Sequence, residues 1–219
     1  MDQGVQALHR LYRRYSSTFI SLAGISTSAG IPDYRSGVGT VLPTGPGAWE
    51  KLATKTKDSK KYSRKAMASA VPTYTHMTFV KLLEEGYLKF MISQNVDGLH
   101  RKSGIPPAKL AEVHGNTNVE KCAKCGKEYM RDYRVRTAQK VFEHKTGRKC
   151  TVPTCKGDLC DSIINFGENL PKREIKAGFE NGAQADLCLA MGSSLRVTPA
   201  ADMPAATAEH GGKLVIVKY

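Results

Sequence analysis

The sequence predicts an α/β fold, in which a parallel, doubly wound sheet carries a small zinc-binding module as an insertion. Short apolar runs of strand length alternate with helical patterns in both parts of the chain. Between these parts lie four cysteines arranged in two pairs. The 219 residues, 41% of them hydrophobic and 24% charged, suffice for one buried core with a small appendage.

Charge and targeting signals narrow the class of protein. No apolar run approaches membrane-spanning length, and the amino end lacks the basic start and apolar segment of a secretion signal. We therefore expect a soluble intracellular protein with reduced cysteines. The net charge of +13 points to anionic partners, such as a phosphate-bearing cofactor, nucleic acid or chromatin.

The first strand is expected at residues 18–22, after an opening helix over residues 5–15. Small residues follow it at positions 23–30, and Arg35 comes shortly after. Such a loop lets backbone N–H groups approach a phosphate closely. The glycine spacing differs from G-x-G-x-x-G, so an ordinary loop of small residues that binds no cofactor would have a similar sequence.

The next stretch has two features of composition. Residues 37–47 are rich in Gly, Pro and Thr and precede the only tryptophan, Trp49, which indicates a loop pinned by one aromatic ring. Residues 51–65 contain seven basic residues and one acidic residue. This segment reads either as a solvated charged face or as a docking surface for an anionic partner.

Polar residues then follow two expected strands. A helix over residues 75–85 leads to a strand at 89–93, after which come Gln94, Asn95 and Asp97. A second strand, 110–113, ends at His114. Ligands of open α/β sheets bind at such strand ends, where a carboxylate favours positive charge and an imidazole can take a proton. A single residue of this kind at a strand end would be interpreted as a structural cap. The four residues together predict a functional site.

The cysteine spacing C-x2-C-x24-C-x4-C predicts one tetrahedral zinc. Its ligands are expected to be Cys122, Cys125, Cys150 and Cys155. Cys160 is a rival for the fourth position, ranked lower because residues 159–164 suggest that the chain is re-entering the main core. With four thiolate ligands the site would be structural. Cys188 reads as a buried core thiol.

The last third returns to the α/β pattern. A helical stretch through residue 179 precedes a strand at 187–191 and a small-residue loop at 192–197. A helix over 199–209 and a final strand at 213–217 follow.

Read in order, the motifs resemble the sirtuin family, and they span most of the chain. The motifs are residues 23–26 (AGIS), 31–35 (IPDYR), 94–100 (QNVDGLH), 113–116 (VHGN), the four cysteines, 165–168 (NFGE) and 192–195 (GSSL). Residues 33–35, 75–77 and 144–148 are most similar to the class IV, nuclear branch.

The resemblance implies a Rossmann-like domain with helices on both sheet faces, formed by residues 1–119 and 161–219, with 37–75 as cofactor loop and basic insert. Residues 120–160 would form the zinc ribbon. It further implies NAD-dependent deacylation of protein lysines, which yields nicotinamide and O-acyl-ADP-ribose, and mono-ADP-ribosyl transfer as a side activity. Nuclear location and histone tails as partners are expected on the same basis.

Site residues follow from the same resemblance, position by position. His114 would be the general base. The NAD-binding set would be Ala23, Gly24, Ser26, Thr27, Asp33, Tyr34, Arg35, Trp49, Gln94, Asn95, Asp97, Gly192, Ser193 and Ser194. The acylated peptide, added as a strand, would lie against Phe166, Gly167, Glu168 and Val197.

Two departures from the family pattern predict weaker NAD binding. Leu22 stands where the family has glycine, and the chain ends at Tyr219, before an Asn-bearing loop that contacts adenosine in the family. A competing reading is a zinc-ribbon protein that binds chromatin or nucleic acid. It rests on the ten basic and three acidic residues between positions 121 and 149.

Overall fold

The computed structural model describes residues 17–21, 23–37, 39–47, 50 and 69–217. Several features expected from the sequence lie outside these residues and stay predictions. They are the opening helix at 5–15, Leu22, Trp49, the basic segment 51–65 and the last two residues.

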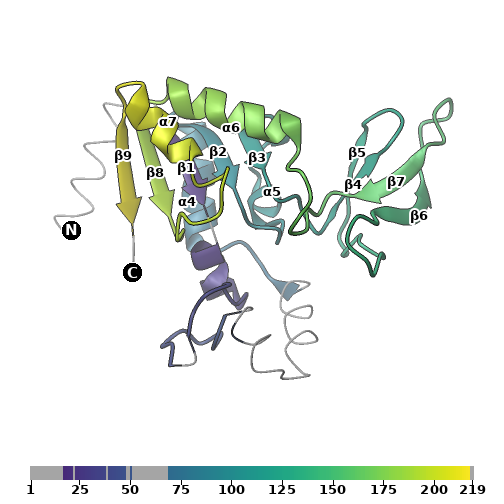
Figure 1. Cartoon of the computed structure of the whole chain (residues 1–219), viewed down its shortest axis with the longest axis horizontal. Coiled ribbons are helices and arrows are strands. Elements are labelled where there is room, and N and C mark those ends of the chain that lie inside the picture. Colours follow the sequence, from purple (N-terminus) through teal and green to yellow (C-terminus); the bar gives the residue numbers. More distant parts are fainter. Residues whose placement is uncertain (1–16, 22, 38, 48–49, 51–68, 218–219) are drawn as a thin grey trace.

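The larger part of the structure is a five-stranded, fully parallel sheet (Figure 1). Its spatial order is β3-β2-β1-β8-β9, so the chain builds outward from β1 in one direction and then in the other. This is the doubly wound pattern expected from the sequence. The strands are β1 (Ser17–Ser21), β2 (Leu88–Ser93), β3 (Leu110–Glu112), β8 (Leu187–Met191) and β9 (Lys213–Val217).

The carboxyl ends of β1, β2, β3 and β8 lie at the same edge of the sheet. Ser21, the last residue of β1, pairs with Ser93 on one side and with Met191 on the other. Ser93 in turn pairs with Glu112 at the end of β3. The loops that leave these strands therefore start at one edge of the sheet, where ligands of such folds bind.

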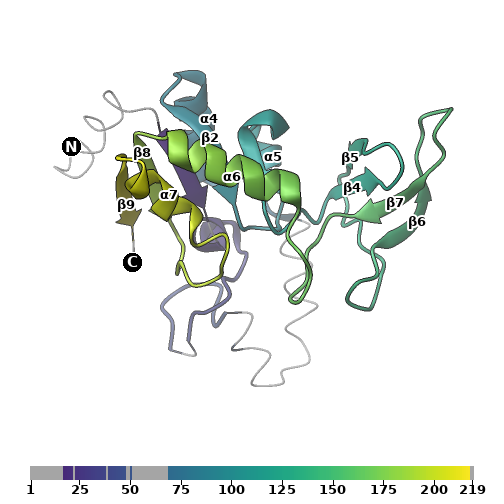
Figure 2. The ribbon, with the colours of Figure 1, turned by 45° about the horizontal axis from the view of Figure 1, so that its top comes forward.

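Helices cover both faces of the sheet (Figure 2). On one face, Phe79 of α4 (Tyr74–Glu84) packs in a buried cluster with Met91 and Leu189. On the other face, Met203 of α7 (Met203–Glu209) belongs to a cluster with Ile92. Neighbouring strand residues thus point to opposite cores, as side chains in a strand must. The remaining helices are α5 (Leu99–Ser103) and α6 (Lys172–Gln184), with 3-10 turns η1 (Ala23–Ala29) and η2 (Pro107–Lys109).

A second, antiparallel sheet forms the zinc module beyond the β3 edge of the main sheet (Figure 1). Its order is β5-β4-β7-β6. The strands are β4 (Val119–Cys122), β5 (Glu128–Met130), β6 (Lys145–Lys149) and β7 (Asp158–Asp161). Its small core contains Cys122, Cys150 and Leu159.

Several expected boundaries are wrong. Residues 158–161 form β7 of the module, so the chain has not yet returned to the main core there, because Cys160 pairs with Lys121 of β4. The helix expected from 199 begins at Met203, since residues 199–202 form turns whose N–H groups bond to Val197 and Pro199. Helix α4 begins at Tyr74, where Thr73 provides a capping box with His76.

None of the helices in the described part of the chain combines the length and the apolar character needed to cross a bilayer.

We predict that Met91→Ala destabilises the protein by about 2–5 kcal/mol, because Met91 is fully buried (0% exposed) and truncation leaves a cavity. The matched control, Met77→Ala, alters a methionine that is 48% exposed and should change stability by less than about 0.5 kcal/mol. Urea unfolding followed by circular dichroism, with zinc present, measures both. Equal effects of the two substitutions would contradict the assigned core.

Candidate functional site

In open α/β sheets the ligand crevice lies where the direction of chain winding reverses, and in this chain that point falls between β1 and β8. Gly24, just after β1, approaches Gly192, just after β8, and its N–H donates to the Gly192 carbonyl at 3.4 Å. A Cβ placed on Gly24 would lie 2.8 Å from the Gly192 Cα. Two backbones without side chains thus lie in contact at this point, an arrangement that lets a phosphate group approach the backbone closely.

Buried hydrogen bonds tie the loop after β1 to the loop after β2. Ser26 Oγ donates to Asp97 Oδ2 at 2.7 Å, and Asn95 Nδ2 donates to Ser26 Oγ at 3.2 Å. Asp97 Oδ1 accepts from the Leu99 N–H at 2.9 Å. These side chains are nearly inaccessible to solvent. The structure therefore brings together residues that are about 70 positions apart in the chain.

Gln94 has an amide group available for a ligand. Its Nε2 is buried and has no hydrogen-bond partner within the described residues. Such an orphaned donor is costly unless something binds it. An amide donor of this kind can bind a hydroxyl-bearing ligand.

His114 follows β3 and is half-buried. Its Nδ1 lies 3.1 Å from the Gln94 carbonyl oxygen. Because a carbonyl can only accept, Nδ1 carries the proton and Nε2 of the neutral ring keeps its lone pair. Burial lowers the pKa of His114, although the Gln94 carbonyl acts in the opposite direction. The imidazole is thus suited to act as a base at neutral pH.

The loop after η1 adds Asp33, Tyr34 and Arg35. Asp33 closes a turn by accepting from the Ser36 N–H at 3.2 Å and from the Ser36 hydroxyl at 2.7 Å. Partial desolvation and the Asp97 charge raise the pKa of Tyr34.

The other small-residue positions occupy the same edge of the sheet. Thr27 donates its hydroxyl to the Gly24 carbonyl at 2.9 Å. Ser193 is buried and accepts from the Leu195 N–H at 2.9 Å, whereas Ser194 is exposed. Val197 lies in the same loop after β8. Ala23 begins η1.

The segment expected to border a peptide runs beside His114. The Ile164 N–H donates to the His114 carbonyl at 3.1 Å. Glu168 accepts from the Asn165 backbone N–H at 2.7 Å, which closes a turn around Phe166 and Gly167. Phe166 is 72% exposed. The turn therefore presents an exposed apolar ring two residues after the residue that bonds to His114.

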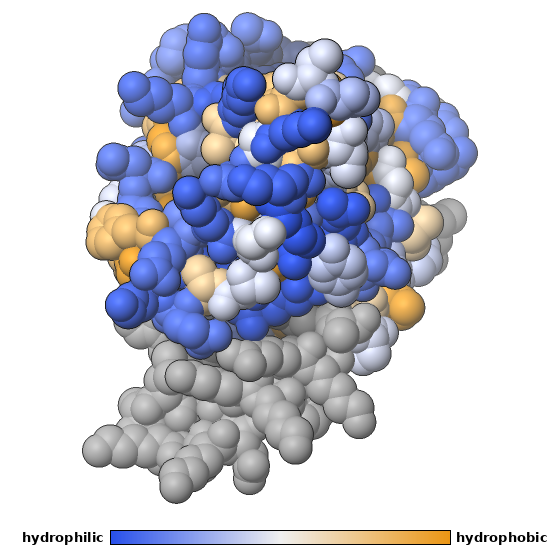
Figure 3. All heavy atoms as spheres, turned by 90° about the vertical axis from the view of Figure 1, so that its right-hand side faces the viewer, coloured by the Kyte–Doolittle hydropathy of each residue, from blue (hydrophilic) through white to orange (hydrophobic). Residues whose placement is uncertain are grey.

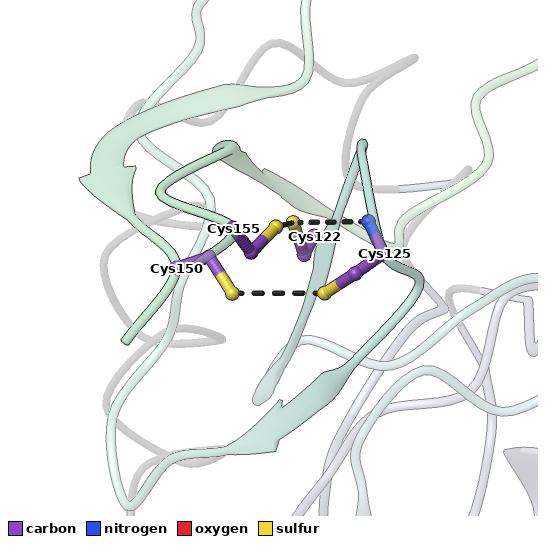
Figure 4. Close-up of side chains that lie close together, drawn as sticks. All are labelled: Cys122, Cys125, Cys150 and Cys155. Atoms are coloured by element: carbon purple, nitrogen blue, oxygen red, sulfur yellow. Dashed lines mark hydrogen bonds between the residues drawn. The ribbon is translucent and has the colours of Figure 1, made fainter. Parts of the chain in front are cut away.

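The four expected zinc ligands converge in the module (Figure 4). All four Sγ atoms lie within 4.8 Å of one another, with 3.5 Å between Cys122 and Cys155 and 3.7 Å between Cys125 and Cys150. A tetrahedral zinc with bonds of about 2.3 Å separates its sulfurs by about 3.8 Å. The cluster thus fits one structural zinc.

The surroundings support this assignment. The Cys125 and Lys124 N–H groups donate to Cys122 Sγ, and this lowers the pKa of the Cys122 thiol toward the metal-binding thiolate. A Cβ at Gly157 would lie 2.8 Å from Cys122 Sγ, so the site also requires a glycine there. Cys160 is not part of the cluster, as expected.

Comparison with known proteins shows to which family the chain belongs. The Sir2 family profile matches residues 22–199. The chain belongs to the Sir2 family. It is 45% identical over 196 residues to an Arabidopsis thaliana protein named NAD-dependent protein deacetylase SRT1, with 89% of the chain and 38% of the relative covered.

Two further members of the Sir2 family extend the comparison. A Rhodopseudomonas palustris protein named NAD-dependent protein deacetylase is 32% identical, with 99% of the chain and 87% of the relative covered. A solved structure described as Sir2 with a p53 peptide and NAD+ matches with a TM-score of 0.66 and 28% identity, covering 99% of this chain and 86% of that chain. The chain spans about two fifths of the length of its plant relative.

Thr73 and His76, to which the sequence analysis gave no role at the site, are linked to the loop after β1. His76 is fully buried (0% exposed), and its Nδ1 lies 2.7 Å from the Thr73 hydroxyl. Its ring centroid lies 4.8 Å from that of His100, with the two rings tilted by 47°. Thr73 also donates to the Ile25 carbonyl at 3.2 Å. The spacing of Thr73 and His76, typical of a capping box, was the available signal.

We predict that Cys150→Ser releases the zinc and unfolds the module, because metal binding there is coupled to folding. The matched control, Cys160→Ser, alters a module cysteine outside the cluster and should keep one zinc per chain. Metal analysis of both purified variants is the measurement. Full zinc in Cys150→Ser together with loss in Cys160→Ser would reverse the ligand assignment.

Proposed function

We propose that the chain is an NAD-dependent protein-lysine deacetylase. The observation that carries the proposal is His114, whose Nδ1 is held by the Gln94 carbonyl while Nε2 is left as a base beside the crevice. The names of the plant and bacterial relatives support the same reaction.

The crevice residues fit NAD. In this proposal the bare backbones of Gly24 and Gly192 let its pyrophosphate approach closely, and the orphaned Gln94 amide donates to a ribose hydroxyl. NAD would supply an activated ribose carbon, which the oxygen of the acyl group on lysine could attack as the bond from that carbon to nicotinamide breaks. The solved structure with NAD+ shows that the fold accommodates this molecule in a relative.

The residues of this chain then have distinct tasks. Asn95 and Asp97 hold the nicotinamide end, and the loop with Tyr34 and Arg35 closes over it to exclude water. His114 takes a proton from a ribose hydroxyl, so that the acyl group can move to the ribose. The phosphates and adenosine ribose are held by Ala23, Gly24, Ser26, Thr27, Gly192, Ser193 and Ser194.

The substrate in this proposal is a peptide that carries an acylated lysine. The segment at 164–168 runs beside His114, and Val197 lies in the loop after β8, so a peptide strand can add between them. Other acyl groups, mono-ADP-ribosyl transfer, histone tails and a nuclear, class IV role are further parts of the proposal. They rest on the sequence motifs at 33–35, 75–77 and 144–148.

The competing function, nucleic-acid or chromatin binding by the zinc module, has weaker support. The module end of the molecule is largely hydrophilic (Figure 3). However, Arg131 and Arg148 both pair with Glu120, and Arg136 pairs with Asp161 at 2.9 Å. These guanidinium groups are engaged within the module, which reduces the positive charge available to phosphates.

Incubation with an acetylated peptide and NAD tests the proposal directly, because the reaction must release nicotinamide and form an acetylated ADP-ribose. Salt-sensitive binding of DNA or RNA without NAD consumption would favour the competing function.

We predict that His114→Ala lowers turnover by about 100- to 10,000-fold, the usual cost of losing a general base. The fold and the zinc content should be unchanged, since the ring is only half-buried. Nicotinamide release measures turnover, and the exposed His210, changed to Ala, is the control. Near-normal turnover in His114→Ala would overturn the assignment.

The pH dependence should follow the same residue. Burial holds the pKa of His114 below its ordinary value of 6.5, and only the neutral ring can accept a proton. We predict that kcat is constant near neutral pH and falls as the pH is lowered, with a midpoint below 6.5. A fall centred above pH 7 would show that another group limits the reaction.

A further inference from the structure

The zinc module contacts the turn that borders the expected peptide. His144 of the module places Nε2 3.2 Å from Glu168 Oε1, and the backbone N–H of Phe142 donates to the same oxygen at 2.7 Å. Glu168 lies 24 residues later, in the turn beside the His114 segment. The Glu168 carboxylate therefore belongs to the turn at residues 165–168 and also contacts the zinc module.

The other side of the His144 ring is anchored in the module. Its Nδ1 lies 3.3 Å from Asp161 Oδ1, at the end of β7. Arg136 donates to both Asp161 oxygens at 2.9 and 3.1 Å and also lies 3.3 Å from His144 Nδ1. The Asp161 carboxylate is fully buried, with 0% of its side chain exposed. The imidazole thus links a fixed point of the module to Glu168.

Glu168 in turn shapes the peptide-side turn. Its carboxylate accepts from the Asn165 N–H at 2.7 Å and from Asn165 Nδ2 at 2.8 Å. Burial raises the pKa of Glu168, but the Asn165 and Phe142 hydrogen bonds outweigh it and bring the pKa to about 2. The group is therefore a carboxylate at neutral pH, and each of these hydrogen bonds is charge-assisted.

Two aromatic rings stand at this turn. Phe142 and Phe166 are each 72% exposed, and the Glu168 carboxylate holds the backbone N–H groups of Phe142 and of Asn165, the residue before Phe166. Phe142 also has a φ of +67°, which is unfavourable for an aromatic residue. Exposed apolar rings on a strained backbone that hydrogen bonds keep in place are typical of a surface that contacts a partner.

We propose that His144 is a positioning residue for the acylated peptide. Through Glu168 it holds residues 165–168 against the module, so that the module contributes to peptide binding without touching NAD. This inference rests on the proposed deacetylase function, and it deepens that function by assigning a peptide-binding role to the zinc module.

Steady-state kinetics of His144→Ala and His144→Gln test the inference. We expect His144→Ala to raise KM for an acetylated peptide by about 10-fold, the effect of losing one hydrogen bond to a charged group. Its kcat and its KM for NAD should stay within about 2-fold of those of the wild-type chain. His144→Gln should recover most of the peptide KM, because the Gln amide can donate to Glu168.

Two controls separate positioning from general damage. His210→Ala removes an exposed histidine at the end of α7 and should leave all constants unchanged. In the double variant His144→Ala/Glu168→Gln, the peptide KM should be no higher than in Glu168→Gln alone, because the two residues act as one unit. Additive effects would overturn the link through Glu168.

Hydrogen exchange gives a readout that does not depend on activity. The Asn165 and Phe142 amides should exchange faster in His144→Ala than in wild type and His144→Gln, while all three keep one zinc per chain. Unchanged exchange and an unchanged peptide KM would overturn the inference, and so would loss of zinc with a parallel rise of both KM values. Failure of the wild-type chain to consume NAD with the peptide would instead overturn the proposed function, and with it this role of His144.

Discussion

The hydrogen bond between Ser26 and Asp97 is the contact on which the site depends. It joins the loop after β1 to the loop after β2 in a buried position, at 2.7 Å. Asp97 also accepts from Leu99 at the start of α5, so one carboxylate fixes both a loop and a helix. Loss of a partner for such a buried carboxylate costs about 1–3 kcal/mol or more. The level ends of the strands bring these groups together, and this hydrogen bond holds them in place.

A second set of contacts fixes the site against the zinc module. Arg101 of α5 bonds to Glu112 at the end of β3 at 2.7 Å and to Glu128 of the module at 2.9 Å. Glu112 also accepts from Asn116 at 2.6 Å, across the turn that contains His114. Burial raises the pKa of Glu112 to about 7, while Arg101 and Asn116 favour its charged form. His114 thus sits in a turn whose shape depends on the Arg101 guanidinium, which also contacts the module.

The sequence was a good guide wherever a local pattern decides the structure. The strands Leu187–Met191 and Lys213–Val217 have the expected bounds because the first is an apolar run and the second is four apolar residues after Lys213. The four cysteines could be paired because two-residue and four-residue spacings restrict their geometry. The prediction of a parallel sheet then implied that the strands end at one edge of the sheet.

Prediction from local sequence patterns failed where contacts between distant residues determine the structure. Strand β6, Lys145–Lys149, is polar and lacks clear alternation, and it exists only because β7 pairs with it. The predicted return to the core at residue 159 failed for the same reason. The contact of His144 with Glu168 crosses 24 residues and two parts of the fold, so no motif could have predicted it.

The two sheets differ in what stabilises them, and this difference gives the metal a wider role. The main sheet has a core on each face, whereas the module core of Cys122, Cys150 and Leu159 is too small to order four polar strands alone. Metal binding must therefore supply much of the order of the module. Glu128 and His144 both belong to the module, and they contact Arg101 and Glu168 on either side of the His114 turn. A structural zinc in the module would thereby stabilise both the His114 turn and the turn at residues 165–168.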